Sequence, residues 1–343
     1  MKTLLVGQAK KIALEWVNQY AATHEIIGAF LNGSSTVLRE EDILPTTSDI
    51  DINMIIDQIK VPPKIGKFVY WGVLLEVSFF PLELISPIRK ALTTYEIANS
   101  FKQDNILVDK TGYLKQVVSL VSKHFSHPRW IGIRCQNALK KSQNGTKAFD
   151  PQLPVLDNVN RWLFPAGICT HVILTAAQTN PTVRLRYLAV RPILLKSNHH
   201  ELYHQLLELL GCQEMDAQRV LYHLNHLTQT FDIAASCKND KFPFSQDITP
   251  QARAVVIQGS QTLIEQQNHQ EAVFWIAVSF QRCHEILRMD NPQKHQELMP
   301  LFLELLTDLG VETNLKIQKR IDKIWELYPV LEQTARQIIF DQK

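Results

Sequence analysis

The sequence predicts an α+β protein in which a small core with a mixed sheet is followed by an all-α helical domain. Short apolar segments of strand length, bounded by glycine, proline or acidic residues, fall within the first 112 residues. From residue 113 onward, apolar residues recur at helical spacing and almost no strand pattern is present. A chain of 343 residues is long enough for two domains. We therefore expect a first domain at residues 1–112 and a helical C-terminal domain at residues 113–343.

The first domain is expected to combine helices and strands. Apolar residues at roughly helical spacing predict a helix at residues 7–24 that packs on the sheet. Residues 68–71 either begin the strand that follows them or form its hairpin partner. The other expected elements are strands at 26–31, 49–56, 73–80 and 105–109, and a weakly helical segment at 84–100.

The second domain is expected to contain helices only. Asn180-Pro181-Thr182 is expected to start one of them, because proline fits the first turn of a helix. Gly211 fits the end of another, and Pro165-Ala166-Gly167 could break a third. The expected helices lie at residues 114–125, 128–141, 156–178, 180 onward, 199–210, 216–235, 250–266, 269–289, 293–309 and 314–342, with polar loops at 144–154 and 238–250.

Three acidic residues of the first domain are candidate metal ligands. Asp49 and Asp51 point to the same face of their strand, because side chains alternate along a strand. Two carboxylates so placed repel one another unless a cation lies between them, and oxygen ligands suit Mg²⁺. Glu76 lies in a strand that is otherwise apolar except for Ser78, where an acid is costly to bury without a metal or proton partner. The alternative is a surface hairpin whose acids are merely solvated.

A glycine- and serine-containing turn precedes these acids. Gly33-Ser34-Ser35 follows an apolar run and has the pattern of a buried strand that enters a turn. The ordered set of strand, Gly-Ser turn, Asp-x-Asp and isolated acid is more specific than any of its parts. Metal ions flanked by carboxylates are what polymerase-like sites use for phosphoryl displacement.

With these motifs, the chain resembles the polymerase-β-type nucleotidyltransferase superfamily, and within it the adenylyltransferases that modify aminoglycoside and lincosamide antibiotics. The resemblance implies that residues 1–112 form the nucleotidyltransferase domain and that the helical domain contributes acceptor contacts. It implies that Gly33, Ser34 and Ser35 bind the triphosphate, and that Asp49 and Asp51 bind Mg²⁺. Glu76 would complete the metal site or act as general base. The loop between Ser34 and Asp49 is at the long end of the family's range.

The implied activity is Mg²⁺-dependent transfer of a nucleoside monophosphate, AMP from ATP, to a hydroxyl of a small-molecule acceptor, with release of pyrophosphate. The alternatives are a nucleotidyltransferase of the toxin–antitoxin type that acts on a protein or RNA, a module that binds nucleotide without transferring it, and a degenerate member of the family. The sequence names neither the acceptor nor the nucleotide. Some relatives build their acceptor cleft between two chains, so the resemblance also allows a homo-oligomer.

Two further groups in the helical half have alternative interpretations. His200-Glu201-Leu202-Tyr203-His204 matches the zinc-protease pattern, so a zinc hydrolase with Glu201 as base is a further alternative activity. The pattern does not place a third zinc ligand, and His223 and His226 are only candidates. The simpler interpretation is a solvated helix face. Arg184, Arg186 and Arg191 could hold the triphosphate, or they could form ordinary ion pairs.

Composition limits the class of partner and the location. The net charge is +2 with no long run of one sign, which argues against a nucleic-acid surface. The N-terminal apolar stretch is too short for a signal peptide, and no run of 18 apolar residues is present, so we expect no membrane span. Five scattered cysteines without a Cys-x-x-Cys pair fit reduced thiols, and so a cytoplasmic location.

Overall fold

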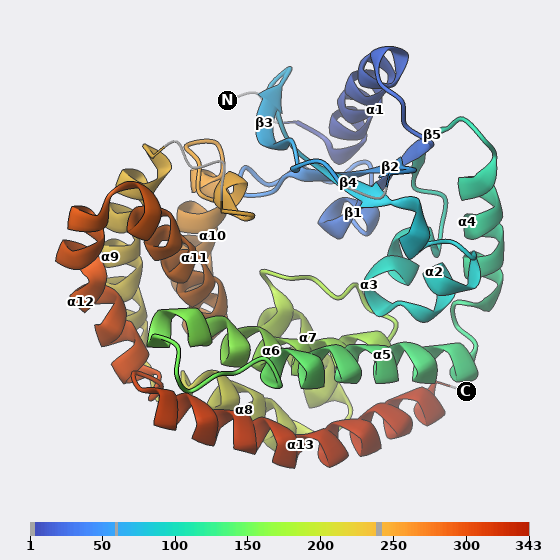
Figure 1. The fold of residues 1–343 in the computed structure, drawn as a ribbon. Coiled ribbons are helices and arrows are strands. Elements are labelled where there is room, and N and C mark those ends of the chain that lie inside the picture. Colours follow the sequence, from blue (N-terminus) through green and yellow to red (C-terminus); the bar gives the residue numbers. More distant parts are fainter. Residues whose placement is uncertain (1–3, 59–60, 238–241, 343) are drawn as a thin grey trace. The chain divides into compact units, whose positions relative to one another are not determined.

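The computed structural model describes residues 4–58, 61–237 and 242–342. It confirms the α+β fold class: a five-stranded mixed sheet lies in the N-terminal part and helices make up the rest (Figure 1). The chain divides into two compact units, Met1–Arg134 and Cys135–Lys343, with the division inside the helix α5 (Pro128–Thr146). The boundary between folding domains that we expect at residue 112 stays a prediction. No helix in the described part of the chain has both the length and the apolar character needed to cross a membrane.

The sheet of the N-terminal unit has the strand order β3-β4-β2-β1-β5. The pair β2–β4 is parallel and the other three pairs are antiparallel, which makes the sheet mixed. Residues 66–70 form the hairpin partner of the strand that carries Glu76, one of the two arrangements expected. The strands are β1 (Gly28–Asn32), β2 (Ile50–Ile56), β3 (Gly66–Tyr70), β4 (Val73–Pro81) and β5 (Ile106–Asp109).

Alternation along the strands gives the sheet two buried faces. One face, which includes Leu31, Ile52 and Leu75, packs against the helix α1 (Val6–Thr23). The opposite face, which includes Phe30 and Ile55, packs against helices on the other side of the sheet (Figure 1). These helices are α2 (Arg89–Thr93), α3 (Tyr95–Ala98) and α4 (Tyr113–His124), together with the short 3-10 turns η2 (Leu82–Leu84) and η3 (Asn99–Phe101).

The helical unit is built around α6 (Val155–Ala176), whose residues are buried on nearly all sides. Such burial requires an apolar sequence all round the helix, and the segment supplies it with residues such as Trp162, Leu163 and Ile173. α6 packs along α13 (Asn314–Asp341) and also contacts α7 (Arg186–Lys196), α8 (His200–Leu210) and α11 (His269–Asp290). The remaining elements are α9 (Ala217–Ala235), η4 (Ser245–Asp247), η5 (Ala254–Gln258), α10 (Gly259–Glu265) and α12 (Pro292–Asp308).

Three expectations for the helical half were wrong. α6 continues through Pro165, because packing on all sides outweighs the loss of one backbone hydrogen bond. α5 continues to Thr146, beyond the expected end of that helix. Pro181 does not start a helix: the Thr182 carbonyl accepts a hydrogen bond from His171 Nε2 (2.9 Å) and the Val183 carbonyl one from Arg186 Nε (2.7 Å). These bonds hold the segment in a loop, and α7 begins at Arg186. Part of the polar loop expected at 238–250 lies outside the described residues.

Candidate active site

The structure brings the three predicted acids together on one face of the sheet. Asp51 on β2 lies directly opposite Glu76 on β4, and Asp49 immediately precedes β2. One carboxylate oxygen from each of the three lies within 4.8 Å of the others. Within the described part of the chain, these three acids form the one cluster of at least three histidine, cysteine or acidic side chains that lie close enough together to hold a metal ion. The arrangement follows from alternation, because Asp51 and Glu76 point away from the face that packs on α1.

The predicted turn lies beside these acids. Gly33 begins the 3-10 turn η1 (Gly33–Thr36) directly after Asn32, which pairs with Asp51 across β1 and β2. Gly33 has a φ of +63°, and a Cβ atom built there would lie only 1.9 Å from Asp51 Oδ2. Glycine is therefore required both by the backbone and by the carboxylate.

The two serines of the turn differ in their surroundings. The Ser35 hydroxyl is fully buried and donates a hydrogen bond to the Asn32 carbonyl (2.8 Å), so it stabilises the turn. Ser34 is only half-buried. Thr36 is also buried, and its hydroxyl donates to the Gly33 carbonyl (2.8 Å). These bonds fix the turn at the edge of the acid group and leave Ser34 as its more exposed hydroxyl.

Two lysines that sequence analysis did not single out complete the site. Lys67 on β3 lies directly opposite Glu76, and its ammonium group contacts both Asp49 Oδ2 and Glu76 Oε2. Lys64 Nζ lies 2.9 Å from Glu76 Oε1, the other oxygen of the same carboxylate. The Lys67 side chain is only 8% exposed, so this is a buried ion-pair network. Asn32, Asp51, Glu76 and Lys67 thus form one polar row across four strands.

The charges in this row are unevenly compensated. Burial raises the pKa of Glu76, but the ammonium groups of Lys67 and Lys64 outweigh burial and hold that pKa below its ordinary value. Burial, followed by the nearby Asp49 and Glu76 carboxylates, raises the pKa of Asp51 well above its usual range. Burial lowers the pKa of Lys67, yet Asp49 and Glu76 outweigh it and hold that pKa above its ordinary value. Asp51 is therefore the acid with too little positive charge near it, which fits a cation-binding position.

Two of the three arginines proposed as phosphate ligands, Arg186 and Arg191, have their partners within the helical unit. Arg186 is buried, with its guanidinium 4.0 Å from the centre of the Phe274 ring. Arg191 Nη1 lies 2.6 Å from Glu271 Oε1, and its Nη2 donates to Asn268 Oδ1 (2.8 Å). These contacts are those of residues that hold helices together.

The histidine motif does not form a metal centre in the described part of the chain. His200, Glu201 and His204 are exposed on α8, and no group of three potential ligands includes them. His223 is buried, and its Nε2 lies 2.6 Å from Asp308 Oδ2. The structure therefore supports the interpretation of a solvated helix face.

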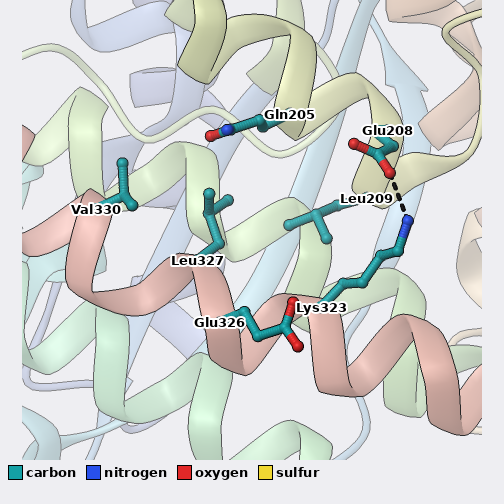
Figure 2. Close-up of a pocket in the computed structure, with 7 residues that line it drawn as sticks. All are labelled: Gln205, Glu208, Leu209, Lys323, Glu326, Leu327 and Val330. Atoms are coloured by element: carbon teal, nitrogen blue, oxygen red, sulfur yellow. Dashed lines mark hydrogen bonds and ion pairs between the residues drawn. The ribbon is translucent and has the colours of Figure 1, made fainter.

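A pocket of about 320 Å³ lies between α8 and α13 of the helical unit (Figure 2). Its walls combine apolar side chains, such as Leu209 and Leu327, with Glu208, Lys323 and Glu326. Lys323 and Glu208 form an ion pair across it, with Nζ and Oε1 2.5 Å apart (Figure 2). The residues that line this pocket do not include a cluster of three acids like the one on the sheet. We therefore place the candidate site at Asp49, Asp51 and Glu76.

Comparison with known proteins gives a limited result. No protein-family model matches the chain, and no curated protein matches it. A solved structure described as a nucleotidyltransferase-like protein from Exiguobacterium sibiricum 255-15 is similar to this chain, with 12% sequence identity over 90% of this chain and 91% of that one, and a TM-score of 0.27. At this identity and TM-score, the similarity adds nothing to the case for an activity, which depends on the site itself.

Proposed function

We propose that the protein is a nucleotidyltransferase that transfers a nucleoside monophosphate, AMP from ATP, to a hydroxyl of a small molecule and releases pyrophosphate. The observation that carries the proposal is the convergence of Asp49, Asp51 and Glu76 within 4.8 Å of one another beside the left-handed turn at Gly33. Three carboxylates next to a turn that permits close approach are the parts that metal-assisted phosphoryl transfer requires.

The three acids fit Mg²⁺ by their chemistry and their surroundings. They offer oxygen ligands only, and the exposed fraction of the Asp49 and Glu76 side chains is 13% and 18%. Asp51 and Asp49 would hold the ion, with Glu76 adding negative charge. When bound, Mg²⁺ would neutralise charge on the phosphates and favour loss of the proton from the acceptor hydroxyl.

The residues of the chain would position the reactants. Gly33 would let the backbone approach the β- and γ-phosphates, and the Ser34 hydroxyl would donate to them. Both lysines contact Glu76 and hold its pKa below the ordinary value, so it is a poor base for the proton of the acceptor hydroxyl at neutral pH. We therefore assign it to charge balance at the metal site. Most of the rate would come from positioning and charge stabilisation.

A small-molecule acceptor is favoured over RNA by the charge of the chain. A net charge of +2 without a basic run offers little to attract a polyanion. The resemblance to antibiotic-modifying adenylyltransferases supports the same choice. Detection of a nucleotide on a protein or RNA by mass spectrometry, with no transfer to small hydroxyl compounds, would instead identify a macromolecular acceptor.

A thermal-shift screen with each NTP, with and without Mg²⁺, tests the proposal. A ligand at about 100 times its dissociation constant adds roughly 2.7 kcal/mol of stability. We expect a Mg²⁺-dependent shift with ATP that is lost in Asp49→Asn and kept in Asp57→Asn, a matched change at an exposed acid just after β2. Pyrophosphate release would then identify acceptors. No shift with any NTP would contradict the proposed nucleotide site.

A further inference from the structure

Lys67 is fixed in the site by the pairing of three strands. The hairpin register places it opposite Glu76, and the β2–β4 register places Glu76 opposite Asp51. Residues paired in this way have their Cβ atoms about 4.5–5.5 Å apart, so their side chains meet on one face. Lys67 therefore belongs to the polar row itself and is not a mobile surface lysine.

The Lys67 ammonium lies where a cation would bridge two of the acids. It contacts Asp49 Oδ2 and Glu76 Oε2 at once. Lys64 contacts the remaining Glu76 oxygen at 2.9 Å. Both oxygens of Glu76 are thus engaged by ammonium groups, whereas Asp51 is not among the acids that these lysines contact in a described ion pair.

We infer that Lys67 takes the place of a second metal ion, so that the site binds one divalent cation, at Asp51 and Asp49, and not two. This inference rests on the proposed function, because it concerns the metal site of the same reaction. Lys67 is here a positioning residue that bridges Asp49 and Glu76, as a second ion would do in a two-metal site.

The charges of the site support this assignment. Three carboxylates and the two lysines carry a net charge of −1, which one divalent ion and its bound phosphates can balance. A second divalent ion between Asp49 and Glu76 would have to lie beside an ammonium group that is 92% shielded from solvent, since Lys67 is 8% exposed. Repulsion between like charges is strong where water is excluded, so the lysine and the ion cannot share this position.

Mn²⁺ binding to the full chain, followed by electron paramagnetic resonance and calorimetry, tests the inference without any turnover. We expect one Mn²⁺ per chain in the wild type and two in Lys67→Met. Lys67→Arg, which keeps the charge, is expected to bind one. Mn²⁺ is also expected to raise the unfolding temperature of Lys67→Met by roughly 3 °C or more beyond its effect on the wild type.

Lys64→Met is the matched control, because the described ion pair of Lys64 involves a single acid, Glu76, and does not bridge two acids as Lys67 does. We expect this variant to bind one ion. Two ions in the wild type, or one in a folded Lys67→Met, would overturn the inference and leave the proposed function standing. If Lys67→Met does not fold, the number of Mn²⁺ ions bound by the wild type and by Lys67→Arg still tests the inference, which requires one ion in each. Failure of every variant to bind Mn²⁺ would overturn the metal site, and the proposed function with it. The expected ion counts without pyrophosphate release for any acceptor would count against the proposed function alone.

Discussion

Gly33 and Asp51 lie so close together that a Cβ atom on Gly33 would be 1.9 Å from Asp51 Oδ2. The two residues come from neighbouring strands: Asn32, just before Gly33, pairs with Asp51. The turn that we propose for the phosphates and the acid that we propose for the metal are therefore one geometric unit. A change in the turn must move the carboxylate, and that coupling can be tested.

Gly33→Ala is expected to reduce nucleotide transfer by at least ~100-fold, because the new methyl group displaces Asp51 from the metal position. The φ of +63° adds backbone strain, so the free energy of unfolding should fall by roughly 1–3 kcal/mol. Gly112→Ala is the control: Gly112 has a φ of +76° but no atom within 4 Å of its Cβ position. It should lose stability and keep its activity. Equal activities in steady-state assays of the two variants would contradict the coupling.

Asp51→Asn is expected to lower turnover by at least ~10³-fold and to leave stability unchanged or higher at pH 8. Burial and the neighbouring carboxylates raise the pKa of Asp51, so its contribution to stability is lost as the pH rises through that raised value. The amide removes this loss because it carries no charge. Thermal unfolding of the wild type and of Asp51→Asn at pH 5 and pH 8 measures this loss of stability, and Asp57→Asn serves for comparison. An Asp51→Asn variant that is less stable than the wild type at pH 8 and still active would contradict both the expected loss of turnover and the expected effect on stability.

Much of the sheet and the acid group could be predicted because they depend on local pattern. Alternation along β2 places Asp49 and Asp51 together, and the single acid in β4 is conspicuous within its apolar run. The place of Lys67 in the site could also have been predicted from the sequence. Trp71 and Gly72 form a two-residue hairpin turn with positive φ angles, and such a turn pairs Tyr70 with Val73 and therefore Lys67 with Glu76. A register worked out from that turn would have found the lysine.

The helical half could not be predicted to the same depth, because its contacts join residues far apart in sequence. The loop after Pro181 is held in part by His171, which bonds the Thr182 carbonyl from eleven residues earlier in the chain, and no local rule relates the two residues. Likewise, Arg191 donates a hydrogen bond to Glu271, which lies 80 residues further along the chain. Patterns of apolar spacing located most of these helices, but they do not say which charged side chain meets which.

Arg191→Met is expected to lower the free energy of unfolding by roughly 2 kcal/mol, because it leaves the buried Glu271 carboxylate without its cation. The double variant with Glu271→Gln should recover part of this loss, since Tyr203, whose hydroxyl is 2.5 Å from Glu271 Oε1, can still donate to the amide oxygen. Urea denaturation measures both. The Mg²⁺–ATP thermal shift of Arg191→Met should match the wild type. A variant with normal stability but no nucleotide shift would instead assign Arg191 to the phosphates.

The unfolding free energy should depend on pH through His284, which stacks on Phe280 and whose Nδ1 lies 3.2 Å from His295 Nδ1. Burial, with repulsion from His295, lowers the pKa of His284 to about 3 from an ordinary 6.5. The contribution of the neutral His284 side chain to the free energy of unfolding is complete above pH 6.5 and is lost as the pH falls toward 3. Between pH 7 and pH 5, His284→Gln should therefore lose roughly 1–2 kcal/mol less than the wild type. His200→Gln, at an exposed position, should keep the wild-type dependence, and urea titrations that give His284→Gln the same dependence would refute the assignment.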